Sequence, residues 1–126
     1  MKSGKIVRSI ERPKEGFSFK REGYKIHISY IEPNSICEID SNYESNTNKE
    51  YQYNYYSYYG SITNYEDLVS KCVLLKYTIE SEISLMAKAI LDPKNSEYLA
   101  YREFVQNCKD ECNNIYIELG LTKNEI

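Results

Sequence analysis

Four side chains in the last third of the chain have types and a spacing that suit a phosphorylated nucleotide. Asn95, Arg102 and Lys109 recur every seven residues, so on a helix they form one ridge, and Tyr98 lies one turn before Arg102. An arginine can donate two hydrogen bonds to phosphate oxygens, an asparagine can read a base edge, and a tyrosine ring can stack on a purine. The structural alternative is that Tyr98 belongs to a helix-pair core and Arg102 pairs with a neighbouring glutamate.

The start of the same helix adds a second feature that suits an anion. Asp92-Pro93 ends one helix and can begin the next, because proline is favoured at the first helical position and aspartate can cap it. The free N–H groups after Asp92 would form the positive pole of a helix, and Lys88 lies one turn earlier. We therefore expect a nucleotide site at this helical turn.

Signatures of catalysis and of metal binding are weak. His27 is the only histidine and falls among strand residues, where a plain surface or interface histidine is more common than a catalytic one. The glycines form neither a G-x-x-x-x-G-K-S/T loop nor a G-x-G-x-x-G loop. Cys108 and Cys112 lie one helical turn apart, but structural zinc takes four such ligands. We expect no enzymatic activity, no metal and no cofactor.

The cysteines allow two interpretations. Cys37, Cys72, Cys108 and Cys112 could form two disulfides, yet none falls in a C-x-x-C pair and the domain is not small enough to need crosslinks. Reduced thiols in the core are the expectation.

Strand patterns occupy residues 1–62. The expected strands cover 5–10, the segment around Phe17 and Phe19, 24–31, 36–39 and 51–59, with a polar loop at 40–50. Tyr51 to Tyr59 holds six of the 14 tyrosines, and its alternation slips at Tyr55-Tyr56, which predicts a bulge or an edge. Those tyrosines suit either a half-buried strand or the stacking of purine bases.

From Thr63 the apolar period changes from two to 3.6 residues. Thr63 and Glu66 form a capping box, and one stripe of a long first helix then comprises Tyr65, Leu68, Cys72, Leu75, Ile79, Ile83, Met86 and Ile90. A second stripe, about 110° away, comprises Leu74, Thr78, Leu85 and Ala89. The second helix repeats apolar residues from Tyr98 to Leu119 and stops at Gly120. Because the first helix has two stripes to bury, we expect a homodimer or larger homo-oligomer.

These patterns predict one α+β domain over 1–126, with an N-terminal antiparallel sheet followed by a C-terminal two-helix hairpin at 63–120. A hydrophobic content of 41% excludes wholesale disorder. No apolar run approaches the roughly 18 residues that a membrane span needs, and the N-terminus does not resemble a secretory signal, so we expect a cytoplasmic protein.

The net charge of −3 is unevenly distributed. Residues 1–25 carry eight Lys and Arg against three Glu, whereas the rest of the chain is acidic. A basic face on an acidic protein could collect a phosphorylated ligand, although an ordinary solvated face fits equally well. A sequence pI near 5.3 and the lack of an Arg-rich helix argue against nucleic-acid binding.

The segment from Asp92 to Phe104, of the form D-P-x-N-x-x-Y-x-x-Y-R-E-F, together with the sheet-first and helices-last plan, resembles the phage-encoded anti-Thoeris signal sponges. The resemblance implies a non-enzymatic protein that assembles into oligomers and sequesters cyclic ADP-ribose isomers made by TIR-domain immune enzymes, inside an infected bacterial host. It also implies a ligand site of aromatic, Asn and Arg side chains, for which Asn95, Tyr98 and Arg102 are the counterparts here. Tyr77 is the nearest aromatic on the first helix.

A different class remains open: a small phage-type inhibitor or adaptor that binds a protein partner. The acidic helices would then face a basic partner, and the tyrosine strand would supply anchors, as tyrosines do at interfaces.

Overall fold

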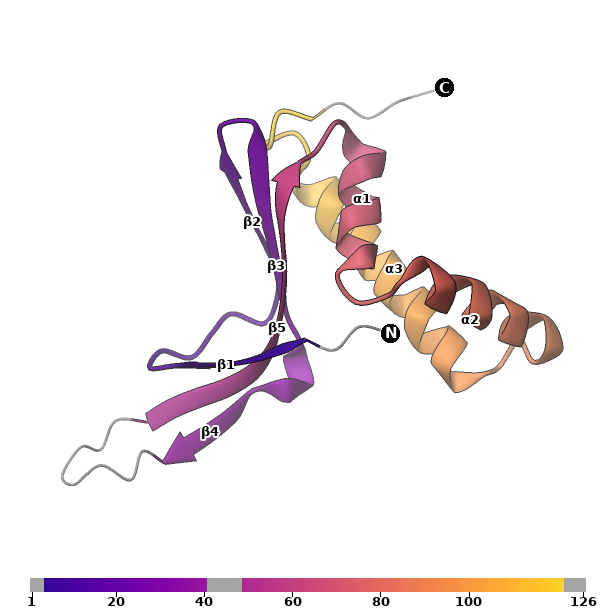
Figure 1. The fold of residues 1–126 in the computed structure, drawn as a ribbon, viewed down its shortest axis with the longest axis horizontal. Coiled ribbons are helices and arrows are strands. Elements are labelled where there is room, and N and C mark those ends of the chain that lie inside the picture. The colour runs from indigo at the N-terminus through magenta and orange to yellow at the C-terminus, as the bar shows by residue number, and fades with distance from the viewer. Residues whose placement is uncertain (1–3, 41–48, 122–126) are drawn as a thin grey trace.

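The computed structural model describes residues 4–40 and 49–121, which form an antiparallel sheet followed by three helices (Figure 1). The expected polar loop at 40–50 falls mostly on 41–48, outside the described residues. The strands are β1 (Lys5–Ser9), β2 (Gly16–Glu22), β3 (Lys25–Ile31), β4 (Cys37–Asp40) and β5 (Lys49–Ser61). The strand order is β1-β5-β3-β2, and β4 also pairs with β5. The predicted α+β class and antiparallel sheet are confirmed.

β5 is the spine of the sheet, because three strands pair with it. β1 pairs with residues 51–55, β3 with residues 55–61 and β4 with residues 49–52. Both main ladders run in continuous register through Tyr55, so the slip at Tyr55-Tyr56 is not a bulge. It marks the residue opposite which β1 begins, at Lys5, and from Tyr56 onward no strand of the described residues covers the side of β5 away from β3. Of the two predicted alternatives, a bulge or an edge, the edge is therefore the correct one.

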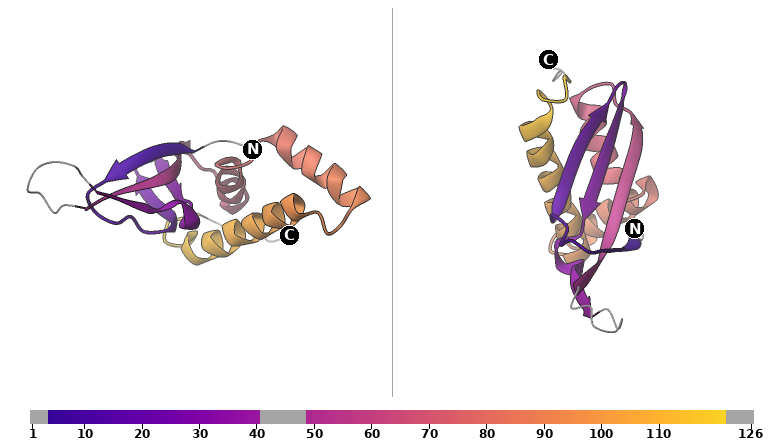
Figure 2. Two further views of the ribbon diagram at one scale, coloured as in Figure 1. Left: turned by 90° about the horizontal axis from the view of Figure 1, so that it is seen from below. Right: turned by 90° about the vertical axis from the view of Figure 1, so that its left-hand side faces the viewer.

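All three helices lie on one face of the sheet, and the other face is open (Figure 2, right). They are α1 (Tyr65–Leu74), α2 (Ile79–Leu91) and α3 (Ser96–Ile115). α1 and α3 pack beside the sheet, whereas α2 extends away from it and contacts α3 (Figure 1). Within the described ranges, none of the helices has the length and apolar character needed to cross a bilayer.

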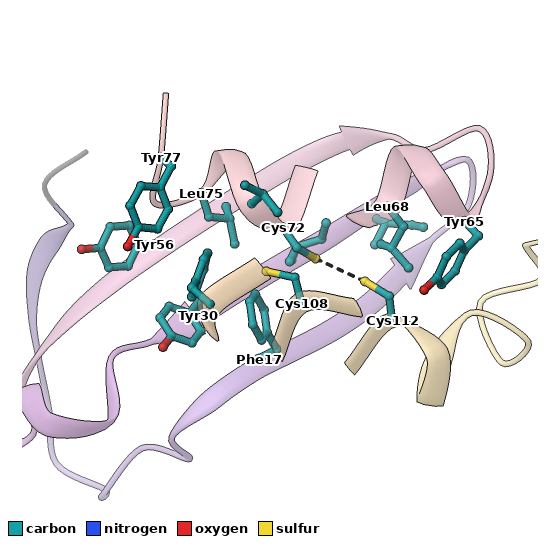
Figure 3. Packing of buried hydrophobic residues seen from close by; sticks show 14 of the residues in the cluster. Phe17, Tyr30, Tyr56, Tyr65, Leu68, Cys72, Leu75, Tyr77, Cys108 and Cys112 are labelled. Atoms are coloured by element: carbon teal, nitrogen blue, oxygen red, sulfur yellow. Dashed lines mark hydrogen bonds between the residues drawn. The ribbon is translucent and has the colours of Figure 1, made fainter. Parts of the chain in front are cut away.

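The core fills the layer between the sheet and the pair α1 and α3 (Figure 3). β3 contributes Ile28, which is completely buried, and α1 and α3 contribute Cys72, Cys108 and Cys112, which are equally buried. The Sγ atoms of Cys72 and Cys112 lie 3.6 Å apart across the two helices (Figure 3). The expectation of free thiols in the core is confirmed for these three cysteines and wrong for Cys37, which is exposed.

The single first helix predicted from 63 to 91 is wrong, because the chain leaves the helix after Leu74 and starts α2 at Ile79. Thr78 stops the helical hydrogen bonding: its backbone is extended and its side chain caps α2 by accepting the N–H of Ser81 at 3.1 Å. The predicted capping box is shifted by one residue, since Asn64 rather than Thr63 accepts a first-turn N–H, that of Asp67.

The turn between α2 and α3 also differs from its prediction, although the two helices do form the C-terminal pair. Asp92 is the C-cap of α2, and Asn95 rather than Asp92 caps α3. α3 ends at Ile115, earlier than the predicted stop at Gly120. Gly120 has a φ of 73° and closes the turn that follows, a conformation that favours glycine.

Candidate functional site

The predicted ridge on α3 is not a single cluster. Asn95 uses its side-chain oxygen to cap the helix, accepting the N–H of Tyr98 at 3.1 Å. Tyr98 is half-buried and packs against the core. Arg102 and Lys109 are exposed. A cap and a core ring therefore account for two members of the ridge, and the other two are exposed cations on the surface of α3.

Lys88 and Tyr77 line a cavity of about 580 Å³ between α2 and α3. Its other lining residues are Lys76, Glu80, Ser81, Ser84, Leu85, Glu97 and Ala100. Arg102 follows Ala100 by two positions, which turns it about 200° around the helix, away from this cavity. The structure therefore brings Lys88 and Tyr77 together but leaves Arg102 on another side of α3.

The charges of the α2–α3 cavity are unfavourable for a diphosphate. Lys88 already contacts Glu97, with Nζ 3.0 Å from Oε2, and this glutamate lies in the first turn of α3, where a phosphate was expected. Glu80 adds a second carboxylate to the lining. Tyr77 is buried, with its ring 5.0 Å from that of Tyr101, and burial raises its pKa. These contacts belong to the structural packing of α2 against α3.

A second cavity, of about 430 Å³, lies beside the open edge of β5. Its lining comes from the start of β1, from β5 and from α1 with the residue after it: Gly4, Lys5, Tyr55, Tyr56, Ser57, Tyr58, Lys71, Leu74 and Leu75. Figure 3 shows Tyr56 and Leu75 on two of these segments. Among the described residues, those that line this cavity include two lysines and no carboxylate. We call it the β5–α1 cavity.

Lys71 and Tyr58 form the polar centre of the β5–α1 cavity. The Nζ atom of Lys71 lies 5.4 Å from the centroid of the Tyr58 ring, within the range of a cation–π interaction. Lys71 also lies 3.9 Å from Asp67 one turn earlier, a long contact for an ion pair. Its side chain is 32% exposed, so it can exchange this weak contact for an anionic ligand.

Two glycines allow the tyrosines to take their positions in the β5–α1 cavity. The Tyr58 hydroxyl donates to the carbonyl of Ser61 at 3.1 Å, and a Cβ at Gly60 would lie 2.5 Å from that hydroxyl. Gly4 lies against the ring of Tyr56, where a Cβ would be 2.9 Å from two ring carbons. Side chains at either position would displace a tyrosine.

A partly buried carboxylate lies behind this cavity. Glu32 accepts hydrogen bonds from Lys76, Tyr56 and Asn54. Burial alone would raise the pKa of Glu32, but the hydrogen bond and charge of Lys76, with the other two donors, lower it overall. Tyr56 lines the β5–α1 cavity and Lys76 lines the α2–α3 cavity, so this network separates the two.

The open face of the sheet carries the only histidine. The Nε2 atom of His27 lies 3.3 Å from the hydroxyl of Tyr55, and its ring meets the edge of Tyr59. Over the described ranges 4–40 and 49–121, no group of three or more His, Cys, Asp or Glu side chains is arranged to hold a metal ion.

Comparisons with known proteins add no relative. Neither models of protein families, nor curated proteins, nor solved structures match this chain.

The sequence predicts two parts of the β5–α1 cavity, but its third part, Lys71, was missed. The tyrosine strand and the basic N-terminal segment stood out as a possible stacking surface and a basic face, and they meet at Lys5 and Tyr55. Lys71 was missed because its spacing from Asp67 is that of an ordinary helix-surface ion pair. Lys71 lines a cavity only because α1 packs beside the free edge of β5.

Proposed function

We propose that this protein is a non-enzymatic binding protein that sequesters a cyclic ADP-ribose isomer in the β5–α1 cavity and so blocks TIR-based antiphage defence. The observation that carries the proposal is the lining of this cavity, in which Lys5 and Lys71 accompany tyrosines without a carboxylate. The resemblance of the segment from Asp92 to Phe104 supplies the ligand class. The β5–α1 cavity is the site we propose for this ligand, in place of the hairpin turn expected from the sequence.

The size and the chemistry of the β5–α1 cavity support a nucleotide as its ligand. A volume of about 430 Å³ falls within the roughly 300 to 1,000 Å³ of small-molecule sites. The two ammonium groups suit two phosphates, and the Tyr58 ring offers a face for adenine. Leu74 and Leu75 provide the apolar part of the wall.

The free edge of β5 supplies further hydrogen-bonding groups. The carbonyl of Asn54 accepts the N–H of Glu32 on the β3 side, so the even-numbered residues of β5 direct their backbone groups toward β3. Ser57 and Tyr59 then direct their N–H and C=O groups toward the uncovered side, next to the cavity. Backbone N–H groups at a sheet edge can donate to phosphate oxygens, and the C=O groups can accept from an adenine amine.

Sequestration requires only that the ligand stay bound and intact. We therefore expect a cyclic ADP-ribose isomer to be released unchanged when the complex is denatured, as chromatography of the supernatant would show. Recovery of a hydrolysed product would make the protein an enzyme and contradict the proposal.

The competing function is that of a protein-binding inhibitor or adaptor, and an exposed apolar stripe on α2 is the observation that favours it. A thermal-shift panel of nucleotides separates the two functions. A ligand at about 100 times its dissociation constant stabilises the folded state by roughly 2.7 kcal/mol, whereas an adaptor that binds only protein would show no shift with any nucleotide.

A further inference from the structure

The face of the sheet opposite the helices is uncovered, and the strand register arranges its side chains in rows (Figure 2, right). In β3 the buried Ile26 and Ile28 alternate with His27, so His27 points to this open face. The register places Lys20 of β2 beside His27, and His27 beside Tyr59 of β5. A cation, an imidazole and a phenol ring therefore form one row across three strands.

Contacts on the open face orient the Tyr59 ring and leave it accessible. The residue is 54% exposed. The His27 ring meets the Tyr59 ring at 83°, with the ring centroids 6.2 Å apart, and the Nζ atom of Lys25 lies 5.4 Å from the Tyr59 centroid. His27 is itself held by the hydroxyl of Tyr55, 3.3 Å from Nε2. An aromatic ring that is already oriented loses little side-chain entropy when a base stacks on it.

A row of three serines follows the row of Tyr59. Ser18, Ser29 and Ser57 are neighbours in the register of β2, β3 and β5, and they alternate onto the same face. Each hydroxyl group can both donate and accept a hydrogen bond. Serine side chains can therefore bond to the donors or the acceptors on a base edge. The open face thus combines a stacking ring with adjacent polar groups.

The charge of the open face differs in sign from that of the chain. Over β2, β3 and residues 55–61 of β5, the charged side chains that alternate onto this face, apart from His27, are Lys20, Lys25 and Glu22. Glu22 lies 3.5 Å from Lys20, a weak pair because both side chains are exposed. The pI near 5.3, which argues against nucleic-acid binding, describes the whole chain, whereas on this face cations outnumber carboxylates.

We propose that the open face of the sheet binds single-stranded nucleic acid, with a base stacked on Tyr59 and phosphates beside Lys20 and Lys25. Bases of a single strand can be splayed out onto a protein ring, and an antiparallel sheet that carries aromatic side chains is a recurring surface for them. Stacking together with cations that follow the backbone is the usual basis of such binding. These three residues line neither of the two cavities described above, so the surface can be tested separately from the β5–α1 cavity.

Fluorescence anisotropy with labelled oligothymidylate DNA and oligouridylate RNA of about 12 nucleotides tests the stacking, since such surfaces contact roughly 4 to 16 nucleotides. The unmodified protein should bind at least one of the two, and their relative affinities distinguish DNA from RNA as the ligand. Tyr59→Val should weaken binding roughly five- to 150-fold, the range for loss of one stacked base, while valine keeps the preference for a strand. Tyr59→Phe keeps the ring and should bind like the unmodified protein.

The salt dependence of the same binding tests the cations. Combining Lys20→Gln with Lys25→Gln should make the slope of log affinity against log salt shallower by about 1.4, because each phosphate contact on a single strand contributes about 0.7. Lys94→Gln, at an exposed position beyond the end of α2, is the matched control and should leave the slope unchanged.

Two sets of results would overturn the proposed surface. The first is absence of binding by the unmodified protein at low salt, or full affinity in a Tyr59→Val variant that melts normally. The second is equally tight binding of a DNA duplex or of a polyglutamate peptide, which would mean that the lysines attract any anion or that the rings contribute nothing.

Discussion

Lys76 and Glu32 form an ion pair that joins the connection between α1 and α2 to the end of β3, with Nζ 2.5 Å from Oε1. The two side chains are 16% and 26% exposed, so the pair is partly desolvated. It holds the connection against the sheet at the point where the helical pattern breaks. The Tyr56 hydroxyl, which borders the proposed nucleotide site, belongs to the same network.

Glu32→Gln should lower the free energy of unfolding at neutral pH by about 1.5 to 3 kcal/mol, the range for a hydrogen bond to a charged group. The pKa of Glu32 in the folded state is lower than its ordinary value of 4.5. Its contribution to stability is therefore complete above that value and is lost as the pH falls through the folded-state pKa. Urea unfolding at neutral and acidic pH measures both effects. Glu11→Gln, at an exposed position, is the control, and an equal response of the two variants would contradict the role of Glu32.

The parts of the fold that could be predicted from the sequence are those determined by residues close together in the chain. Alternation from Tyr24 to Ile31 predicts β3, and the period of 3.6 predicts the helical second half. The apolar stripe runs without interruption from Tyr65 to Ile90, so it hides the break that Thr78 causes. That break is stabilised by Lys76 and Glu32, which are 44 positions apart in the chain, and a local pattern does not contain such a contact.

The candidate site, like the fold, could be predicted only in the parts that a local sequence pattern contains. Tyrosines on β5 and cations near the N-terminus could be recognised from composition. Their meeting with Lys71 depends on β1 beginning at Lys5, opposite Tyr55, which leaves the edge of β5 beyond Tyr55 uncovered beside α1. Strand register is determined by pairing across the sheet, and a slip of one residue changes which groups face a cavity.

The buried thiols should be far less reactive than the exposed one. A hydrogen bond with Cys112, together with burial, raises the pKa of Cys72, and burial raises that of Cys108. Because the thiolate is the reactive form, a disulfide reagent such as DTNB should rapidly modify Cys37 alone in the folded protein and all four cysteines after denaturation. Rapid modification of any thiol in the folded Cys37→Ser variant would contradict the packing of the core.

The helix caps can be tested by a pair of neighbouring substitutions. Asn64→Ala should lower the free energy of unfolding by about 1 kcal/mol, because it removes the acceptor for the Asp67 N–H at the start of α1. Thr63→Ala should cost less than about 0.5 kcal/mol, since Thr63 is exposed and its side chain makes one long contact of 3.4 Å with Asp67. Thermal denaturation ranks the two variants, and a larger effect at Thr63 would restore the capping box predicted from the sequence.

Gly60→Ala should disturb the β5–α1 cavity through Tyr58. The added Cβ would approach the Tyr58 hydroxyl to 2.5 Å, so the ring must leave its position over Lys71 and give up the bond to Ser61. We expect a loss of roughly 0.5 to 1.5 kcal/mol in stability, the usual contribution of such a hydrogen bond, and weaker nucleotide binding. A double-mutant cycle with Tyr58→Ala checks the mechanism, because Gly60→Ala should have little further effect once the ring is gone.

Calorimetric titration with a cyclic ADP-ribose isomer tests the central claim, with Lys71→Gln and Arg102→Gln as the paired variants. The unmodified protein should bind the ligand, and Lys71→Gln should weaken binding roughly ten- to a hundredfold, because a charged hydrogen bond to phosphate contributes about 1.5 to 3 kcal/mol. Arg102→Gln should leave affinity unchanged, since Arg102 is exposed on α3 and does not line the β5–α1 cavity. Loss of binding in Arg102→Gln with full affinity in Lys71→Gln would return the site to the hairpin turn, and absence of binding by the unmodified protein would contradict the proposed function itself.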